Sequence, residues 1–368
     1  MGKLIIKFVV PLERDDLEGI SSRHGPLFHR WLPDGENDEI SIKRQSKNVR
    51  VKLWFERCGY INDRGWISFD YKRREIDSDT LSRQAKVDAG PLYGKIFIKD
   101  LKSEEVKAVV ENKLDDEEYI KVGKKITKII NKDIIPFINY LRNHCGQYWV
   151  KELHPWNSQA ESLGSYFMRI SAKWSVDESA EWQKFLPDKL ESRAVVTINL
   201  DSDYSPYLSK DNWLSLESFN PEQCNDSLSI KLLSRAHQLN DEGNIRQSFV
   251  EGVTSLELAL NEFFQKRVNL GKSLRREMKS FWQLPLHAQL TTVASCLPNS
   301  SHDDIEIAIR AIRVRNKIVH EGFNPRNDFE TKKIIKALFR IISKLLSDID
   351  LKFPSASNSG NTLFPKEG

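Results

Sequence analysis

The residues of this chain that are best suited to chemistry lie close together, from Arg315 to His320. Asn316 directly follows the arginine, and Gly322 comes two residues after the histidine. In a helix that turns about 100° per residue, Asn316 and His320 share one face, which Arg313 joins three residues earlier. Arg315 points about 140° away from His320, but its long side chain can reach around a last helical turn.

These residue types suit chemistry at a phosphate ester of RNA. We expect the helix to end at Gly322, which places His320 at a helix C-terminus, where the partial negative charge favours a protonated imidazole. A histidine that titrates near neutrality can exchange a proton with a ribose hydroxyl. The guanidinium of Arg315 can stabilise a pentacoordinate phosphate as negative charge develops on it. Together these groups could cut RNA without a metal ion.

Asn316 interrupts an apolar series on the helix that should carry these residues. That helix is expected to begin at Asp303 or Asp304 and to bury a stripe spaced by three and four residues, formed by Ile305, Ala308, Ile309, Ile312 and Val319. Asn316 stands where the stripe should continue, and a polar group on a packed seam is costly unless it is satisfied. It could bond across a dimer seam, hold His320 in position, or cap the helix end together with His320.

The hydrophobic pattern before about residue 219 has a period of two, which is typical of strands. Strands are expected at 4–10, 39–43, 49–55, 66–71, 92–98, 166–171 and 195–200. They predict an antiparallel sheet domain, either a sandwich or a partly closed barrel. Helices are expected at 103–114 and 126–143, with Pro136 marking a break or a first turn. Eight of the nine tryptophans fall in this half, and we interpret them as packing residues, with an aromatic recognition surface as the alternative.

A segment at 213–225 is interpreted as a linker, and after it the hydrophobic period becomes 3.6. Helices are expected at 227–240, 245–268, 286–296, 303–322 and 328–346. Their short connections predict a compact helical bundle. The chain is therefore expected to be an α+β protein with three parts: a β-rich domain at 1–225, a helical domain at 226–352 and a disordered tail at 353–368.

Composition limits the class of protein. With 368 residues, 39% of them hydrophobic and 29% charged, the chain suits a globular protein of about two domains. The net charge of +4 neither demands nor excludes nucleic acid. No apolar run is long enough to cross a membrane, and Lys7 interrupts the apolar start, so a cytoplasmic protein with reduced thiols is expected. The cysteines are too widely spaced for a zinc site: Cys58, Cys145, Cys224 and Cys296.

The helical half, over about 227–351, resembles the HEPN family of ribonuclease domains. The signature of that family is an arginine, four to six further residues and a histidine, often with a polar residue directly after the arginine. The segment from Arg315 through Asn316 to His320 fits the shortest form. The resemblance implies a metal-independent endoribonuclease that needs no cofactor and leaves a 2′,3′-cyclic phosphate. It also implies a homodimer, in which two copies of these three residues make one composite site.

The resemblance extends to other parts of the chain. The helix at 245–268 looks like the long early helix of the family, which implies a supporting acidic residue; Glu257 is the candidate and Glu251 the alternative. Arg313 is a candidate phosphate contact. Many members of the family are toxins or abortive-infection effectors in prokaryotic antiviral defence. By this resemblance, the β-rich half would sense a trigger, such as a protein, and license the nuclease.

A basic stripe on the last expected helix fits RNA as the partner. Its members recur every fourth residue: Lys332, Lys336, Arg340 and Lys344. Such a stripe can follow phosphates, although a solvated helix face is the simpler interpretation. Single-stranded RNA or a tRNA loop is the expected substrate, because unstacked loops expose the 2′-hydroxyl. The competing hypothesis is a non-catalytic protein that dimerises through the helical domain and binds a protein, peptide or glycan through the β domain.

Overall fold

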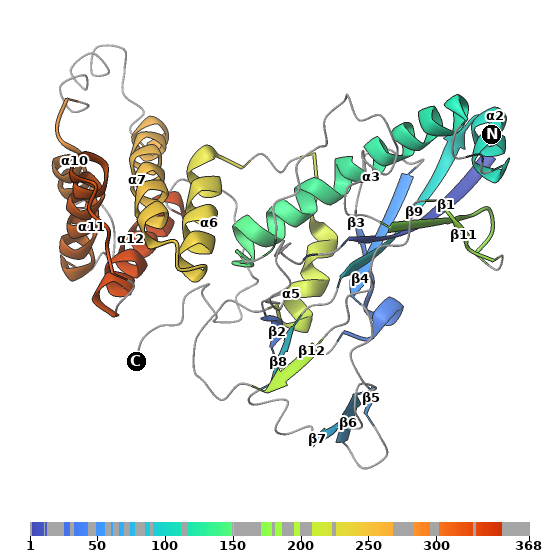
Figure 1. Cartoon of the computed structure of the whole chain (residues 1–368), viewed down its shortest axis with the longest axis horizontal. Helices are drawn as coiled ribbons and strands as arrows, with labels where there is room; N and C mark the ends of the chain where they lie inside the picture. Colours follow the sequence, from blue (N-terminus) through green and yellow to red (C-terminus); the bar gives the residue numbers. More distant parts are fainter. Residues whose placement is uncertain are drawn as a thin grey trace. The chain divides into compact units, whose positions relative to one another are not determined.

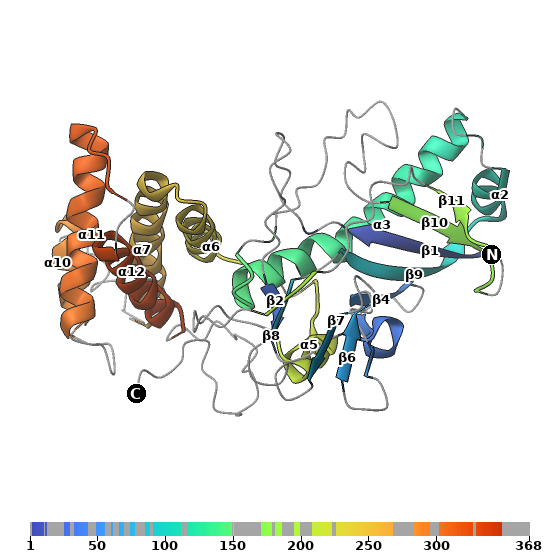
Figure 2. The same cartoon turned by 60° about the horizontal axis from the view of Figure 1, so that its bottom comes forward.

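The structure is a computed structural model, and Figures 1 and 2 show it from two directions. It describes residues 2–10, 12, 26–29, 33–42, 49–55, 60–61, 66–69, 74–77, 85–88, 91–111, 113, 116–148, 150, 171–178, 181–185, 195–198, 208–222, 226–267, 283–294, 302–326 and 329–347. The described residues up to 222 belong to one compact unit, and those from 226 to 347 belong to a second. The expected tail at 353–368 and most of the expected strand at 166–171 lie outside the described residues.

The first unit is built on a six-stranded antiparallel sheet in the order β11-β10-β1-β9-β4-β3. Its strands are β1 (Gly2–Val10), β3 (Ile40–Ile42), β4 (Val49–Phe55), β9 (Leu92–Leu101), β10 (Ser171–Ser175) and β11 (Gln183–Lys184). Every second residue of a strand points to the same face. In β1 this puts Leu4, Ile6, Phe8 and Val10 on one face, where all four are buried in the core of the unit.

A long helix, α3 (Glu117–His144), packs its apolar residues into the same core as that face of the sheet (Figure 2). The large sheet is thus paired with a helix in the described part of the unit, and the expected sandwich or barrel is wrong there. Pro136 lies inside α3 without ending it, so the expected break is also wrong. A proline in a helix costs about 3 kcal/mol. Full burial of Ile134, Phe137 and Leu141 on both sides of it offsets that cost.

The segment expected to be a linker begins inside the core of the first unit. It forms α5 (Lys210–Ser215) and a short 3-10 helix, η2 (Leu216–Ser218). Trp213 is fully buried, and its indole N–H donates to the carbonyl oxygen of Asp38 at 2.7 Å. This prediction was wrong for its first part, because one buried aromatic anchor outweighs the polar residues around it. Trp54, Trp174 and Trp213 are all buried, which confirms the packing interpretation for these three tryptophans.

Smaller elements complete the first unit. In sequence, the 3-10 helix η1 (Gly35–Asp38) directly precedes β3, and the helix α2 (Ser103–Glu111) directly follows β9. Two three-stranded sheets have the orders β12-β8-β2 and β5-β6-β7. Their strands are β2 (Pro26–His29), β5 (Tyr60–Ile61), β6 (Trp66–Phe69), β7 (Arg74–Asp77), β8 (Ala85–Asp88) and β12 (Val195–Ile198). With antiparallel sheets here and helices in the second unit, the chain is an α+β protein.

The second unit is helical throughout its described part. Its helices are α6 (Leu228–Asp241), α7 (Ile245–Arg267), α10 (Leu286–Ala294), α11 (His302–Glu321) and α12 (Phe329–Ser347). Phe249 and Leu256 of α7, Ile312 of α11 and Leu338 of α12 share one core. Gly252 lets α7 and α12 approach closely, since a Cβ at this position would lie 3.0 Å from the Leu338 side chain. None of the helices in the described residues is long and apolar enough to cross a membrane.

Candidate functional site

The candidate residues occupy the last turns of α11, as their spacing predicted. The helix ends at Glu321, and Gly322 then adopts a left-handed conformation with φ of +69°. The amide of Phe323 donates back to the carbonyl oxygen of Lys317 at 3.2 Å, which closes the helix end. Glycine is favoured here because a side chain strains a left-handed backbone. His320 is therefore fixed in the final turn, beside a sharp change of chain direction.

The exposed face of this helix end carries three of the predicted residues. Arg313, Asn316 and His320 are all exposed, which agrees with the shared face expected from steps of three and four. The expectation that Asn316 lies on the packed stripe is wrong. Val319, which was assigned to that stripe, is 51% exposed.

The buried stripe of α11 passes through Arg315 instead. Its fully packed members are Ala308, Ala311, Ile312 and Ile318. Arg315 stands one turn from both Ile312 and Ile318 and is half-buried. The sequence pattern pointed to the wrong edge of the stripe, because α7 and α12 decide which edge of α11 is covered. The polar residue on the packed seam is the arginine.

One hydrogen bond and one buried, unpaired nitrogen describe the environment of the Arg315 guanidinium. Its Nη1 donates to the Oδ1 of the neighbouring Asn316 at 3.2 Å, on the exposed side. Its Nε is shut off from solvent and has no hydrogen-bond partner among the described residues. A buried unpaired donor costs about 1–3 kcal/mol, so an arginine is a poor choice here for stability alone. Asn316 thus holds the end of the guanidinium at the surface, while the aliphatic part of the Arg315 side chain crosses the buried stripe of α11.

The acidic candidates on α7 do not join this group. Glu257 is exposed, and no ion pair or side-chain hydrogen bond links it to Arg315 or His320 among the described residues. The carboxylate of Glu251 lies 3.0 Å from the Nε of Arg235, on α6. Among the described residues, Glu257 therefore has no contact that would give it the supporting role implied by the resemblance, whereas Glu251 pairs with Arg235.

The basic stripe on α12 is split between two environments. Lys332 and Lys336 are exposed, as the prediction required. Arg340 is half-buried, and its Nη2 lies 2.6 Å from the Oδ1 of Asp304 in the first turn of α11. Lys344 is half-buried as well. Arg340 therefore braces α12 against α11, and the exposed cations of the stripe are confined to the first half of α12.

Charge is concentrated around this helix end. Residues 310–336 contain eight lysines and arginines against three acidic residues, a net charge of +5, whereas the whole chain carries +4. The segment contains the end of α11, the connection and the start of α12. A surface of this sign attracts an anionic polymer.

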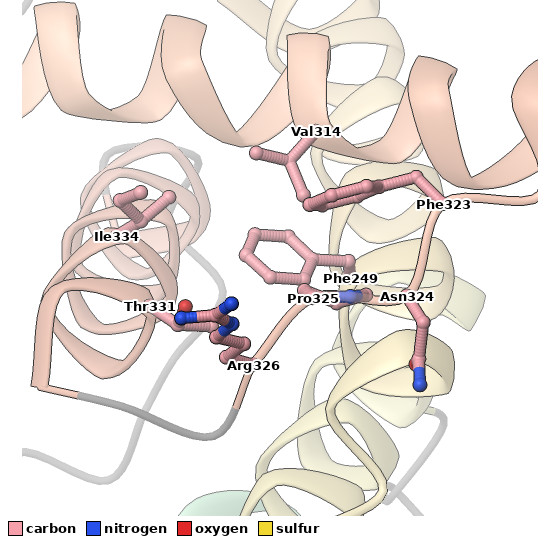
Figure 3. A pocket seen from close by; sticks show the side chains of 8 residues that line it. All are labelled: Phe249, Val314, Phe323, Asn324, Pro325, Arg326, Thr331 and Ile334. Carbon is pink, nitrogen blue, oxygen red and sulfur yellow. The ribbon is translucent and has the colours of Figure 1, made fainter.

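A pocket of about 230 Å³ opens directly beyond the motif (Figure 3). Its lining residues come from α7, α11, α12 and the loop after Gly322: Phe249, Val314, Phe323, Asn324, Pro325, Arg326, Thr331 and Ile334. Figure 3 shows Phe323 and Val314 on one side, Ile334 and Thr331 on the other, and Phe249 between them. The sequence reasoning missed this pocket, because its lining comes from four segments that only the fold brings together. The run from Phe323 to Arg326 beside the motif was the available signal.

Comparison with known proteins adds nothing to this geometry, since no family model, curated protein or solved structure matches the chain.

Proposed function

We propose that this protein is a metal-independent endoribonuclease whose site lies at the C-terminal end of α11. The observation that carries the proposal is the placement of Arg315. It occupies a packed position at a cost in stability, and Asn316 directs it to the surface that also bears His320. Functional groups are often placed where stability alone would not put them. The resemblance to HEPN ribonucleases supports the same assignment.

The proposed reaction is an internal transfer at the phosphate. The imidazole of His320 accepts the proton of a ribose 2′-hydroxyl, and the 2′-oxygen forms a bond to the adjacent phosphorus. Arg315 stabilises the negative charge of the pentacoordinate phosphate. The bond from phosphorus to the 5′-oxygen then breaks, and that oxygen leaves with a proton from a second imidazolium. The products are a 2′,3′-cyclic phosphate and a 5′-hydroxyl, with no cofactor required.

The second imidazolium would come from a second copy of the chain, as the resemblance to HEPN ribonucleases implies. Exposed apolar side chains beside the motif suit such a dimer: Val319 is 51% exposed and Phe323 is 44% exposed. A contiguous apolar patch at the surface often marks a contact site. The composite site would then bring two copies of Arg315, Asn316 and His320 together.

The biological role follows from the resemblance. Unrestrained RNA cleavage would poison a host cell, so we propose a cytoplasmic effector of the abortive-infection or toxin type. The first unit, with its antiparallel sheets, would sense the trigger, and single-stranded RNA or tRNA loops would be the substrate. The alternative is a binding protein that dimerises but does not cut.

The test compares wild type with His320→Ala and His287→Ala on total tRNA in the presence of EDTA. His287 is the matched control, since it is an exposed histidine on α10 in the same unit. We expect wild type and His287→Ala to cut and His320→Ala to be inactive, with equal thermal stability for all three. Equal cleavage by His320→Ala would refute the proposal. Absence of cleavage by all three, also when the proteins are purified from phage-infected cells, would favour the binding protein.

A further inference from the structure

Four lysines lie in one row across the large sheet of the first unit. The strand register places Lys173 of β10 opposite Lys7 of β1, Lys7 opposite Lys95 of β9, and Lys95 opposite Lys52 of β4. All four alternate with core residues, so they share the face opposite the α3 core. Neighbouring strands are about 4.8 Å apart, and like charges directly opposite each other destabilise a sheet. Stability alone therefore does not explain the row.

Aromatic residues lie beside this lysine row on the same face. Along β9 the face reads Tyr93, Lys95, Phe97, Lys99, which alternates aromatic and basic side chains. Tyr93 and Phe97 are half-buried, and Lys99 is exposed. Rings that reach the surface between cations are typical of sheets that stack unpaired bases.

Two of the four ammonium groups lie over a buried ring. The Nζ atoms of Lys7 and Lys95 lie 5.4 and 5.5 Å from the ring centroid of Trp54, which is only 3% exposed. Trp54 in turn stacks on Tyr93, with 6.1 Å between ring centroids. The ring face attracts both ammonium groups, and the side chain of Lys7 stays 34% exposed while that of Lys95 is 13% exposed.

Two carboxylates form ion pairs with lysines of the row. Glu36 of η1 lies 3.3 Å from the Nζ of Lys7 and 2.5 Å from that of Lys95, and Glu39 pairs with Lys52. Burial raises the pKa of Glu36, but the hydrogen bonds and charges of Lys95 and Lys7 outweigh it, so the pKa lies below its usual value. Lys173 has no ion-pair partner in the described part of the chain. Four ammonium groups thus face two carboxylates, and Glu36 remains 45% exposed in its side chain.

We propose that the lysine row and the rings of Tyr93 and Phe97 bind single-stranded nucleic acid, with Glu36 standing in for a phosphate until the strand displaces it. The lysines would contact successive phosphates, and the rings would stack on unpaired bases. An acidic polypeptide would use the lysines but would give the rings no role. The site lies in the first unit, so this inference does not depend on the proposed nuclease. A nucleic acid strand would then be the ligand of the first unit, for which we propose a sensing role.

The experiment measures fluorescence anisotropy of the full chain with a labelled oligothymidylate of about 12 nucleotides, within the usual site size. DNA lacks the 2′-hydroxyl, so binding is measured apart from the proposed cleavage. Lys7→Gln with Lys173→Gln should weaken binding at least about tenfold and make the slope of log K against log salt shallower by about 1.4, at about 0.7 per phosphate contact. Phe97→Ala should weaken binding at least about fivefold.

Two further variants serve as controls. Lys107→Gln with Lys121→Gln removes the same charge from exposed positions on α2 and α3 and should leave the affinity unchanged. Glu36→Gln removes the competing carboxylate and should tighten binding, a gain that misfolding cannot produce.

Three outcomes would overturn the proposal. In the first, wild type does not bind the probe, or the Lys7 and Lys173 pair loses no more affinity than its control pair. In the second, binding depends on Lys332 and Lys336, which would place the strand on the second unit. In the third, polyglutamate displaces the labelled oligonucleotide as well as the polyanion heparin does, and Phe97→Ala does not change the affinity. That result would identify an acidic polypeptide as the ligand.

Discussion

Replacing Arg315 with methionine separates function from stability at the proposed site. The arginine Nε is buried without a partner in the described structure, which costs about 1–3 kcal/mol. The variant loses the exposed bond from Nη1 to Asn316, which contributes about 0.5–1 kcal/mol. Methionine is of similar length and fits an apolar seam between Ile312 and Ile318. We therefore expect Arg315→Met to stabilise the second unit by about 0.5–2 kcal/mol.

Urea unfolding of wild type and Arg315→Met measures this change, and RNA cleavage is assayed on the same preparations. We expect a higher unfolding midpoint together with loss of cleavage. Arg315→Lys is the control, because it retains a positive charge and lacks the planar guanidinium; it should lose most of the cleavage without the gain in stability. A variant that is less stable than wild type by more than about 1 kcal/mol would refute the reasoning, since Arg315 would then be a structural residue.

Three other perturbations test the second unit. Val319→Asp should leave the melting temperature within about 2 °C of wild type and shift the protein from dimer to monomer in analytical ultracentrifugation, because Val319 is 51% exposed; an unchanged dimer would exclude this face. Gly252→Val should lower stability by about 1–3 kcal/mol in urea, because its side chain would meet Leu338; no loss would mean that α7 and α12 are packed less closely. Burial lowers the pKa of His237 to about 3, so this ring stays neutral in the fold while the unfolded chain takes up a proton below about pH 6.5. Stability should fall by about 1–2 kcal/mol from pH 7 to pH 5, and His237→Phe, beside Phe339, should remove that part of the change; an equal fall in the variant would contradict the assignment.

Local patterns predicted many of the elements, because their signal is contained in consecutive residues. The alternation in β1 and β9 and the 3.6-residue period of α7 and α12 are examples. The pattern missed β10, since Lys173 and Ser175 give a five-residue strand little apolar character. It also missed the role of Trp213, whose burial depends on contacts with distant strands and on Asp38.

The candidate site was predictable in its spacing but not in its burial. Helical geometry alone puts Asn316 and His320 on one face, and the structure agrees. Which edge of α11 is packed depends on neighbouring helices, so the burial of Arg315 could not be read from the sequence. The lysine row could be predicted even less from the local sequence pattern. Lys7, Lys52, Lys95 and Lys173 become neighbours only through the pairing of four strands.

The most direct test of the central claim uses an RNA substrate with a single 2′-deoxynucleotide at the mapped cleavage position. If His320 activates the 2′-hydroxyl, wild type should cut the all-ribose substrate to a 2′,3′-cyclic phosphate and leave the 2′-deoxy substrate intact at that position. Cleavage of both substrates at similar rates would contradict the account, because the 2′-oxygen would then not be the nucleophile.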